Sequence, residues 1–589
     1  MKRLHILPVY PLFPVSFWSF KYALDFIDVP AQMPPLGLAT VAAMLPQDHF
    51  DIHRIIDLNV EPLQDEQIKA ADLIFASSML VQRDSLEEII SRAHTHGKKV
   101  VAGGPYPTSY REEVKADHLV LGEAEASLQP FLNDLLQGNA KKVYDESSLK
   151  GKPSLHHTPV PRWDLLNVKK YSSFAIQYSR GCPFDCEFCD ITNLFGRVSR
   201  TKTTVQMIKE LEAVKNTGWR GSLFVVDDNF IGNKTKVRQL LPAVKSWQEQ
   251  NNHPFSLFTE ASTDLGLPNH ADILEGMVAA GFDQVFLGIE SPDAEVLEKM
   301  NKKHNSRLYE KIRNIQRAGL EVLGGFIVGN DKEKPEVFQN LFQFIQETGV
   351  VIPMVGLLTA LRNTRLYERL SLEGRLRGES SGNNTHHLGF NFKPELDEAF
   401  LMKGYVSLLD KLFSSKNFYE RCRILGEHRG HYHTATSINK SNIKAFAKIL
   451  YQNLIRSPDY HFIAYALGTA LTRPRQFPDA MNQAAKLYHF KTMTKATVSV
   501  QRYQEVAESI YQRFQKKVSR LQERFTGDIE SHLQNLQHLS YDMLEKASKK
   551  YHRIHEDFRA DAKGILDDLR QRMESYIHSH KLALASTIS

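Results

Sequence analysis

Cysteine is scarce in this chain: 589 residues contain only four, which are too few for a disulfide framework. Because disulfides form in oxidising compartments, this scarcity predicts a cytoplasmic protein with reduced thiols. Long apolar runs are lacking as well, since no stretch reaches the roughly 18 residues that a membrane-spanning helix needs. Pro8, Pro11 and Pro14 interrupt the apolar start of the chain, so a secretory signal peptide is not predicted. A net charge of +6 is small for this length and gives no reason to expect a nucleic-acid partner.

The alternation of strand-like and helix-like segments divides the chain into an α/β part and a helical part. Residues 1–150 predict a doubly wound, Rossmann-like parallel sheet, because short β-branched strands alternate with helices. Residues 151–170, with several prolines, predict a linker. Residues 171–367 contain six strand candidates separated by helices, which predicts a partial (β/α)6 barrel. Strands then vanish, and a helical domain is predicted for residues 368–496.

The last part of the chain, residues 497–589, is highly charged and has apolar residues at helical spacing. One or two long amphipathic helices are predicted there, in an arrangement such as a helical hairpin. These helices can pack on the rest of the protein or on each other. The alternatives are docking of a partner, self-association and contact with a membrane surface. Acidic and basic residues are interleaved, which weighs against binding of nucleic acid or anionic lipid by this segment.

Small residues follow the predicted strands of the first domain. In a doubly wound sheet, ligands bind at the carboxyl ends of the strands, and glycine there lets a ligand approach the backbone closely. The residues in this position are Ser77, Ser78, Gly103, Gly104, Gly122 and Glu123. A ligand site is one interpretation, and a set of tight turns is the other.

Three of the four cysteines, Cys182, Cys186 and Cys189, lie within eight residues. Thiols so close together in a reduced protein are usually metal ligands. Zinc normally takes four protein ligands, but no histidine lies between residues 172 and 214 and Cys422 is remote, so zinc is not favoured. An iron–sulfur cluster held by three thiolates would keep one iron open for a ligand outside the protein, which is a catalytic feature. Cys422 itself is interpreted as an ordinary buried thiol.

The segment Cys182-Pro-Phe-Asp-Cys186-Glu-Phe188-Cys189, which directly follows a predicted strand, resembles the signature of the radical S-adenosylmethionine (SAM) superfamily. The resemblance implies that the three cysteines hold a 4Fe–4S cluster whose fourth iron binds SAM. It further implies that one electron, from a flavodoxin-like or ferredoxin-like donor, cleaves SAM to methionine and a 5′-deoxyadenosyl radical, which abstracts hydrogen from the substrate. The cofactors then supply the difficult chemistry, while the protein positions them and excludes water.

The same resemblance assigns SAM contacts to the ends of the later barrel strands and to the aromatic residue before the last cysteine. A carboxylate is suited to the SAM ammonium group, and Asp227 and Asp228 have this place after the second strand. The other residues implied to contact SAM are Phe188, Glu260, Ser262, Glu290, Ser291, Gly325, Ile327 and Gly329, the last three along the adenine. Any one of these acids alone could instead cap a helix or lie in a solvated turn.

The first domain resembles the cobalamin-binding domain that often precedes this barrel. The residues implied to contact cobalamin are Ser77, Ser78, Gly103, Gly104, Pro105, Gly122 and Glu123. The D-x-H-x-x-G motif that supplies a histidine to cobalt in mutase-type domains is absent. Asp51-Ile52-His53 is nearest to it, and we interpret His53 as a structural residue of a buried strand. Radical SAM relatives commonly lack this ligand, so its absence leaves cobalamin binding open.

The span up to about Cys422 most resembles a bacterial subgroup that contains hopanoid C-2 methylases. The main hypothesis is therefore a cobalamin-dependent enzyme that methylates an unactivated carbon of a small-molecule or lipid substrate. Two alternatives stay open: radical SAM cyclisation, ring contraction or carbon–carbon coupling without methyl transfer, and an inert cobalamin-binding or scaffold protein. Methylthiotransferases are set aside because their additional clusters need more cysteines than Cys422. The two domains are expected to face each other across the active site.

Overall fold

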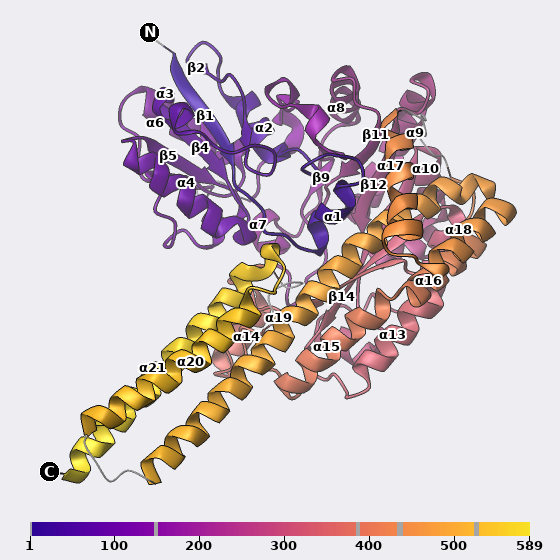
Figure 1. Ribbon diagram of the computed structural model, residues 1–589. Coiled ribbons are helices and arrows are strands. Elements are labelled where there is room, and N and C mark those ends of the chain that lie inside the picture. The colour runs from indigo at the N-terminus through magenta and orange to yellow at the C-terminus, as the bar shows by residue number, and fades with distance from the viewer. Residues whose placement is uncertain (1–2, 147–150, 384–388, 433–439, 524–528, 589) are drawn as a thin grey trace. The chain divides into compact units, whose positions relative to one another are not determined.

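The computed structural model describes residues 3–146, 151–383, 389–432, 440–523 and 529–588. The chain forms two compact units, one extending from the N-terminus to His489 and the other starting at Phe490 (Figure 1). Within the described residues, every helix is either too short or too polar to cross a bilayer. The site residues predicted from sequence all lie in the first unit.

The first unit begins with a parallel sheet. Its strands are β1 (Leu4–Tyr10), β2 (Phe50–Asp51), β3 (Ile56–Asp57), β4 (Leu73–Ser77), β5 (Lys99–Gly103), β6 (His118–Val120) and β7 (Val143–Tyr144). The strand order is β2-β1-β4-β5-β6-β7, and β3 pairs with the end of β1. The chain therefore moves first to one side of β1 and then to the other, as a doubly wound sheet requires.

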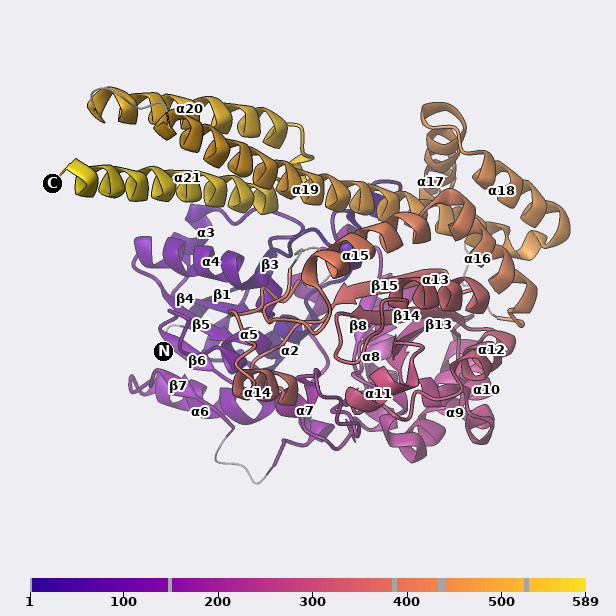
Figure 2. The same ribbon diagram turned by 90° about the horizontal axis from the view of Figure 1, so that it is seen from below.

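Helices cover both faces of this sheet. On one face, α3 (Asp65–Ala70) and α4 (Arg83–Thr95) bury a core with side chains such as Ile74 and Val100 (Figure 2). On the other face, α2 (Leu36–Met44) and α6 (Ala124–Leu136) pack against residues such as Phe75. The strands are buried on both faces, which explains their nearly continuous apolar sequences.

The six strands predicted for the second domain are present. They are β8 (Phe174–Ile176), β11 (Gly221–Val225), β12 (Phe255–Ala261), β13 (Phe282–Glu290), β14 (Glu321–Val328) and β15 (Ile352–Leu357). All neighbours are parallel, in the order β15-β14-β13-β12-β11-β8. Among the described strands, β15 and β8 do not pair, so the barrel is open. Between the strands lie α8 (Thr204–Asn216), α9 (Lys234–Gln250), α10 (Ala271–Ala279), α12 (Leu308–Ala318) and α13 (Val337–Thr348).

Helices follow the barrel, as the sequence predicts. They are α14 (Arg365–Leu372), α15 (Glu398–Leu412), α16 (Ser415–His428), α17 (Lys440–Tyr451) and α18 (Tyr460–Thr472). Both α15 and α16 pack against α13 of the barrel. The Cys422 side chain on α16 is only 1% exposed, which agrees with its interpretation as a buried thiol.

The end of the chain is helical, but it contains three long helices rather than the one or two predicted: α19 (Phe477–Glu523), α20 (Ile529–Tyr551) and α21 (Arg559–Ile588). In the second unit they bury Phe514, Leu536 and Met573 between them. The helices thus pack on one another, which is one of the arrangements predicted from the sequence. The domain boundaries stay predictions; the one placed near residue 497 falls inside α19.

A buried ion pair near the start of the barrel predicts a large effect of one substitution. Lys202 and Glu210, 3% and 1% exposed, bind each other between β10 (Arg200–Thr201) and α8. Lys202→Met would leave a carboxylate buried without its partner, which typically costs about 3–5 kcal/mol. We expect a clearly lower unfolding temperature in thermal denaturation. Lys215→Met, which removes the more exposed ion pair with Glu212, should change the unfolding temperature little. Equal unfolding temperatures of the Lys202→Met and Lys215→Met variants would contradict this prediction.

Candidate active site

The three clustered cysteines lie in one loop between β9 (Ser179–Arg180) and α7 (Ile191–Phe195), directly after the first barrel strand. All three are half-buried free thiols. The loop turns back on itself, because the Cys189 amide donates to the carbonyl of Cys186 at 3.2 Å. Burial raises the pKa of each thiol, so holding the thiolates that a metal requires needs compensating positive charge.

The donor set fits an iron–sulfur cluster better than a single zinc ion. Two sulfurs on one zinc lie at most about 4.6 Å apart, since each Zn–S bond is about 2.3 Å. Among the described residues, the cysteines are not a group whose ligand atoms all lie within 4.8 Å of one another. Three thiols without a fourth protein ligand match a cluster that keeps one iron open.

The residue before Cys182 must be glycine. Gly181 has a φ of +92°, and a Cβ atom there would lie 2.6 Å from the carbonyl oxygen of Val198. The Gly181 amide donates to a carboxylate oxygen of Asp228 at 2.7 Å. The cysteine loop and the end of β11 are therefore joined at this point.

Asp227 is buried, and its carboxylate is used by the protein itself. It accepts hydrogen bonds from the amides of Tyr178 and Ser179 and from the Ser179 hydroxyl, at 2.7–2.9 Å. Burial raises its pKa to about 7. These contacts hold the turn that leads into the cysteine loop, while the predicted contact of Asp227 with SAM stays a prediction.

Asp228 and Glu260, at the ends of the neighbouring strands β11 and β12, form a partly buried acidic pair. Burial raises the pKa of Asp228 to about 6 and that of Glu260 to about 7, and the charges of Asp228 and Asp227 add to the second shift. In the described part of the chain, the Glu260 carboxylate has no hydrogen bond or ion pair, and the nearby Ser262 hydroxyl is buried without a partner. A cation bound here would compensate this charge, so the residues fit the SAM ammonium group.

Glu290 ends β13 with a φ of +65°, a conformation rare for residues other than glycine. It forms an ion pair with Lys302, whose ammonium lies 5.7 Å from the ring of Phe188. Burial opposes the charge on Lys302, but Glu290 and the thiols of Cys186 and Cys189 outweigh it and raise its pKa. Lys302 is thus a buried cation beside the cysteine loop, and the sequence analysis did not single it out.

The remaining residues predicted to contact SAM lie at the ends of β13 and β14. Ser291 is buried and accepts a hydrogen bond from the Asp293 amide at 3.1 Å. Gly325 and Ile327 are partly buried on β14. Gly329 has a φ of +95°, and a Cβ atom there would lie 2.2 Å from the Phe390 ring.

Most of the residues predicted to contact cobalamin meet at the carboxyl edge of the first sheet. Ser77 and Gly103 are direct partners on β4 and β5. Gly104, with a φ of +95°, lies so close to Ser77 and Ser78 that a Cβ atom would not fit. Pro105 begins the short helix α5 (Pro105–Ser109). The Ser78 hydroxyl is buried without a partner, which fits a polar ligand at this edge.

Gly122 and Glu123 are occupied by other parts of the protein. A Cβ atom on Gly122 would lie 2.7 Å from the Glu146 side chain. The Glu123 carboxylate is 1% exposed and binds Arg180 and Arg200 at 2.7–3.0 Å. The first domain is thereby tied to Arg180, two residues before the first cysteine. The sequence analysis missed both arginines, and the role of Glu123 toward cobalamin stays a prediction.

The interpretation of His53 as a residue of a buried strand is wrong. The strand is broken between β2 and β3, and the His53 side chain is 69% exposed. Its ring lies 4.7 Å from that of His5, and both are close to Asp51. Because β2 pairs with the start of β1, these residues lie away from the edge that carries Ser77.

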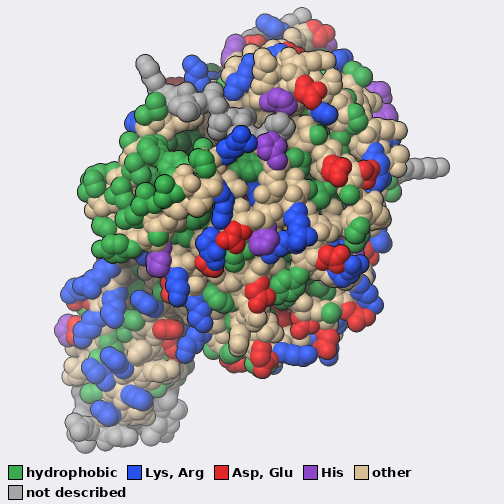
Figure 3. Space-filling model, turned by 90° about the vertical axis from the view of Figure 1, so that its right-hand side faces the viewer, with side chains coloured by type: hydrophobic (Ala, Val, Ile, Leu, Met, Phe, Trp, Pro, Cys, Tyr) green, Lys and Arg blue, Asp and Glu red, His purple; other side chains and the backbone are tan. Residues whose placement is uncertain are grey.

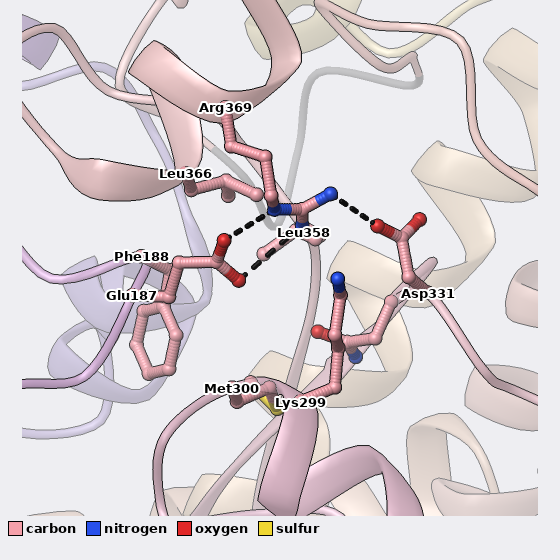
Figure 4. Close-up of a pocket in the computed structure, with 9 residues that line it drawn as sticks. Glu187, Phe188, Lys299, Met300, Asp331, Leu358, Leu366 and Arg369 are labelled. Atoms are coloured by element: carbon pink, nitrogen blue, oxygen red, sulfur yellow. Dashed lines mark hydrogen bonds and ion pairs between the residues drawn. The ribbon is translucent and has the colours of Figure 1, made fainter. Parts of the chain in front are cut away.

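A small pocket lies beside the cysteine loop, and its lining includes Glu187, Phe188 and Arg369 (Figure 4). The Arg369 guanidinium on α14 binds both the Glu187 carboxylate and that of Asp331. The Leu366 amide also donates to the carbonyl of Glu187 at 2.9 Å. Helix α14 therefore holds the segment between Cys186 and Phe188 in place.

Three family models match the chain: "B12 binding domain" over residues 24–132, "Radical SAM superfamily" over residues 176–345 and "Domain of unknown function" over residues 364–503. An uncharacterised methyltransferase of Synechocystis sp. is 38% identical over 493 residues, which cover 82% of this chain and 90% of that protein. The chain belongs to the B12-binding radical SAM family. The hopanoid C-2 methylase of Rhodopseudomonas palustris, another relative, is 36% identical over 63% of this chain and 71% of its own length.

Solved structures agree on the fold. The radical SAM methyltransferase TsrM from Kitasatospora setae has a TM-score of 0.55 at 14% identity, over 83% of this chain and all of that one. The matches confirm the family, the fold class and the enzyme class that the sequence predicts, and they support the cofactor set at the level of the family. The roles of individual site residues stay predictions.

The acidic pair predicts a pH-dependent stability of the protein without cofactors. The pKa of Glu260 in the folded protein, about 7, exceeds its ordinary value of 4.5, so folding should weaken as pH rises through this window and the buried carboxylate ionises. We expect Glu260→Gln to raise the unfolding temperature at mildly alkaline pH by about 2 °C or more and to weaken SAM binding. The exposed control Glu275→Gln should do neither. A wild-type advantage at alkaline pH would contradict the assignment.

The contacts of Arg369 predict that it stabilises the cysteine loop. Arg369→Gln would remove the ion pair with Glu187, next to Cys186. We expect a reconstituted cluster to lose its iron–sulfur absorbance faster in air, with an altered electron paramagnetic resonance signal. Arg423→Gln is the matched control, because Arg423 also binds two carboxylates but at the surface. Equal rates of loss in the two variants would show that the loop does not depend on Arg369.

Proposed function

We propose that this enzyme uses SAM and cobalamin to methylate an unactivated carbon of a small-molecule or lipid substrate. The observation that carries the proposal is the tie from Glu123 of the first domain to Arg180, beside the three-thiol loop of the barrel. It links the sheet predicted to bind cobalamin with the loop predicted to hold the cluster. The methylases among the relatives support methyl transfer as the reaction.

Cys182, Cys186 and Cys189 would hold the cluster. Asp228 and Glu260, both partly buried, would bind the SAM ammonium group, with the Ser262 hydroxyl as a further polar contact. When bound, the cluster and SAM would supply the radical that abstracts hydrogen from the substrate, and cobalamin would supply the methyl group.

Lys302 would balance the negative charge of the thiolates, because its buried ammonium lies beside two of the cysteines. Its ammonium, held by Glu290, is also suited to bind the carboxylate of the methionine part of SAM. The other residues predicted from sequence, Asp227, Phe188 and Ser291, would keep this end of the site in shape. Gly325, Ile327 and Gly329 would lie along the adenine.

In the first domain, the Ser78 hydroxyl and the glycine-rich ends of β4 and β5 would bind cobalamin. The further residues of this edge are Ser77, Gly103, Gly104, Pro105 and Gly122. The protein would not supply His53 to cobalt, since that residue lies away from the carboxyl edge.

The proposed partners follow from the reaction and from the helical end of the chain. A flavodoxin-like or ferredoxin-like protein would donate the electron that the cluster needs. The helices of residues 497–589 would dock a partner or associate with a second copy. We place the enzyme in the cytoplasm, in contact with a membrane surface when its substrate is a lipid.

The test uses anaerobically purified and reconstituted full-length protein, with metabolite and lipid extracts as substrate and methyl-labelled SAM. We expect bound iron and corrinoid, and label in a product heavier by one methylene. Cys186→Ala should abolish iron binding and label transfer. Cleavage of SAM without label in any product would favour cyclisation or coupling instead, and protein free of corrinoid after reconstitution would sink the cobalamin assignment.

A further inference from the structure

Apolar side chains gather on the surface of α17, of α18 and of the π-helical turn Gln452–Arg456 between them, in the domain of unknown function (Figure 3). We call this set the α17–α18 apolar surface. Its members are Ile443, Phe446, Tyr451, Leu454, Ile455, Tyr460, Leu467 and Leu471, each between 38% and 84% exposed. Large apolar patches of this kind are rare on proteins that act alone in water, and they mark binding surfaces.

These residues do not belong to the faces by which the two helices pack on the rest of the protein. Ala445 and Ile449 of α17, and Phe462 and Ala466 of α18, are buried within the first unit. Helix α18 is therefore apolar on the inner and on the outer face, while the outer side of α17 combines Ile443 and Phe446 with Lys444. The whole of α18, Tyr460–Thr472, contains no Asp, Glu, Lys or Arg, whereas an ordinary surface helix presents charged residues to water.

The segment that carries the apolar surface is rich in basic residues, of which Lys444 and Lys448 form ion pairs with Asp28 and Arg473 lies near Glu427. Residues 440–475 contain six Lys or Arg and a single acid, Asp459. That acid is turned to the protein, where it accepts hydrogen bonds from the amides of His461 and Phe462 and caps α18. Arg456 and Arg475 are exposed. An apolar face rimmed by cations matches a membrane with anionic headgroups.

We propose that the α17–α18 apolar surface rests on the surface of an anionic lipid bilayer. Leu454, Ile455, Leu467 and Leu471 would enter the acyl boundary, and the basic residues would meet the phosphates. Tyr451 and Tyr460 suit the interface, because their rings are apolar and their hydroxyls are polar. This deepens the membrane contact of the proposed function and assigns it to α17 and α18 rather than to the C-terminal helices. It requires no methyl transfer.

The test is flotation of the full-length, iron-loaded protein with vesicles of phosphatidylcholine and phosphatidylglycerol, without substrate or reductant. We expect the wild type to float with these vesicles, and less with phosphatidylcholine alone. Ile455→Glu combined with Leu471→Glu should reduce the bound fraction about tenfold or more, because two apolar side chains are lost and negative charge is added. Val205→Glu, an equally exposed site on α8 of the barrel, should float as the wild type does.

Circular dichroism, thermal unfolding and iron content establish that the double variant is folded. Flotation of this variant equal to that of the wild type would overturn the inference, and so would a wild type that stays in solution. Sedimentation velocity without vesicles tests the alternative that a second copy of the chain covers this surface. A wild type that is dimeric and does not float, together with a monomeric double variant, would assign the surface to a dimer interface. Because no turnover is involved, methyl transfer can fail while vesicle binding stands, and the reverse.

Discussion

Buried negative charge at the ends of the barrel strands is the constraint on which this site depends. Three half-buried thiols that must ionise to bind iron share this end of the barrel with the carboxylates of Asp228 and Glu260, and Asp228 lies near Cys182. Such charge is costly unless cations accompany it. Lys302 supplies one fixed cation, and a ligand with its own positive charge would supply another. A positively charged cosubstrate would therefore fit these electrostatics.

The cysteine loop is short, so its shape comes from distant segments of the chain. Asp227 holds the turn before it, Gly181 allows the close crossing of backbones, and Arg369 binds the loop from α14. Arg180 ties the same loop to the first domain. The contacts of Asp227, Arg369 and Arg180 are charged or polar, and each joins the loop to a different element. The order of the loop therefore depends on the folding of the whole first unit.

The strands and the residues at their ends could be predicted from the sequence, because buried parallel strands have continuous apolar sequences and their carboxyl ends meet at one edge. Asp228 and Glu260 could be expected to be neighbours for that reason. Lys302 and Arg369 could not, since both reach the site from irregular or helical segments without any periodic signal. His53 was misjudged because one apolar segment is split into two short strands. A helical repeat also does not reveal where a long helix ends, so three C-terminal helices were taken for one or two.

The ion cluster between the two domains limits how freely the parts of this protein can be exchanged. Arg180 and Arg200 are mostly buried, and their counterions Glu123 and Glu125 come from the first domain. A chimera that received its first domain from a relative without matching acids would strand two guanidiniums in a poorly hydrated interface. We therefore expect a chimera to fold only when the acids of the first domain and the arginines of the barrel come from the same protein.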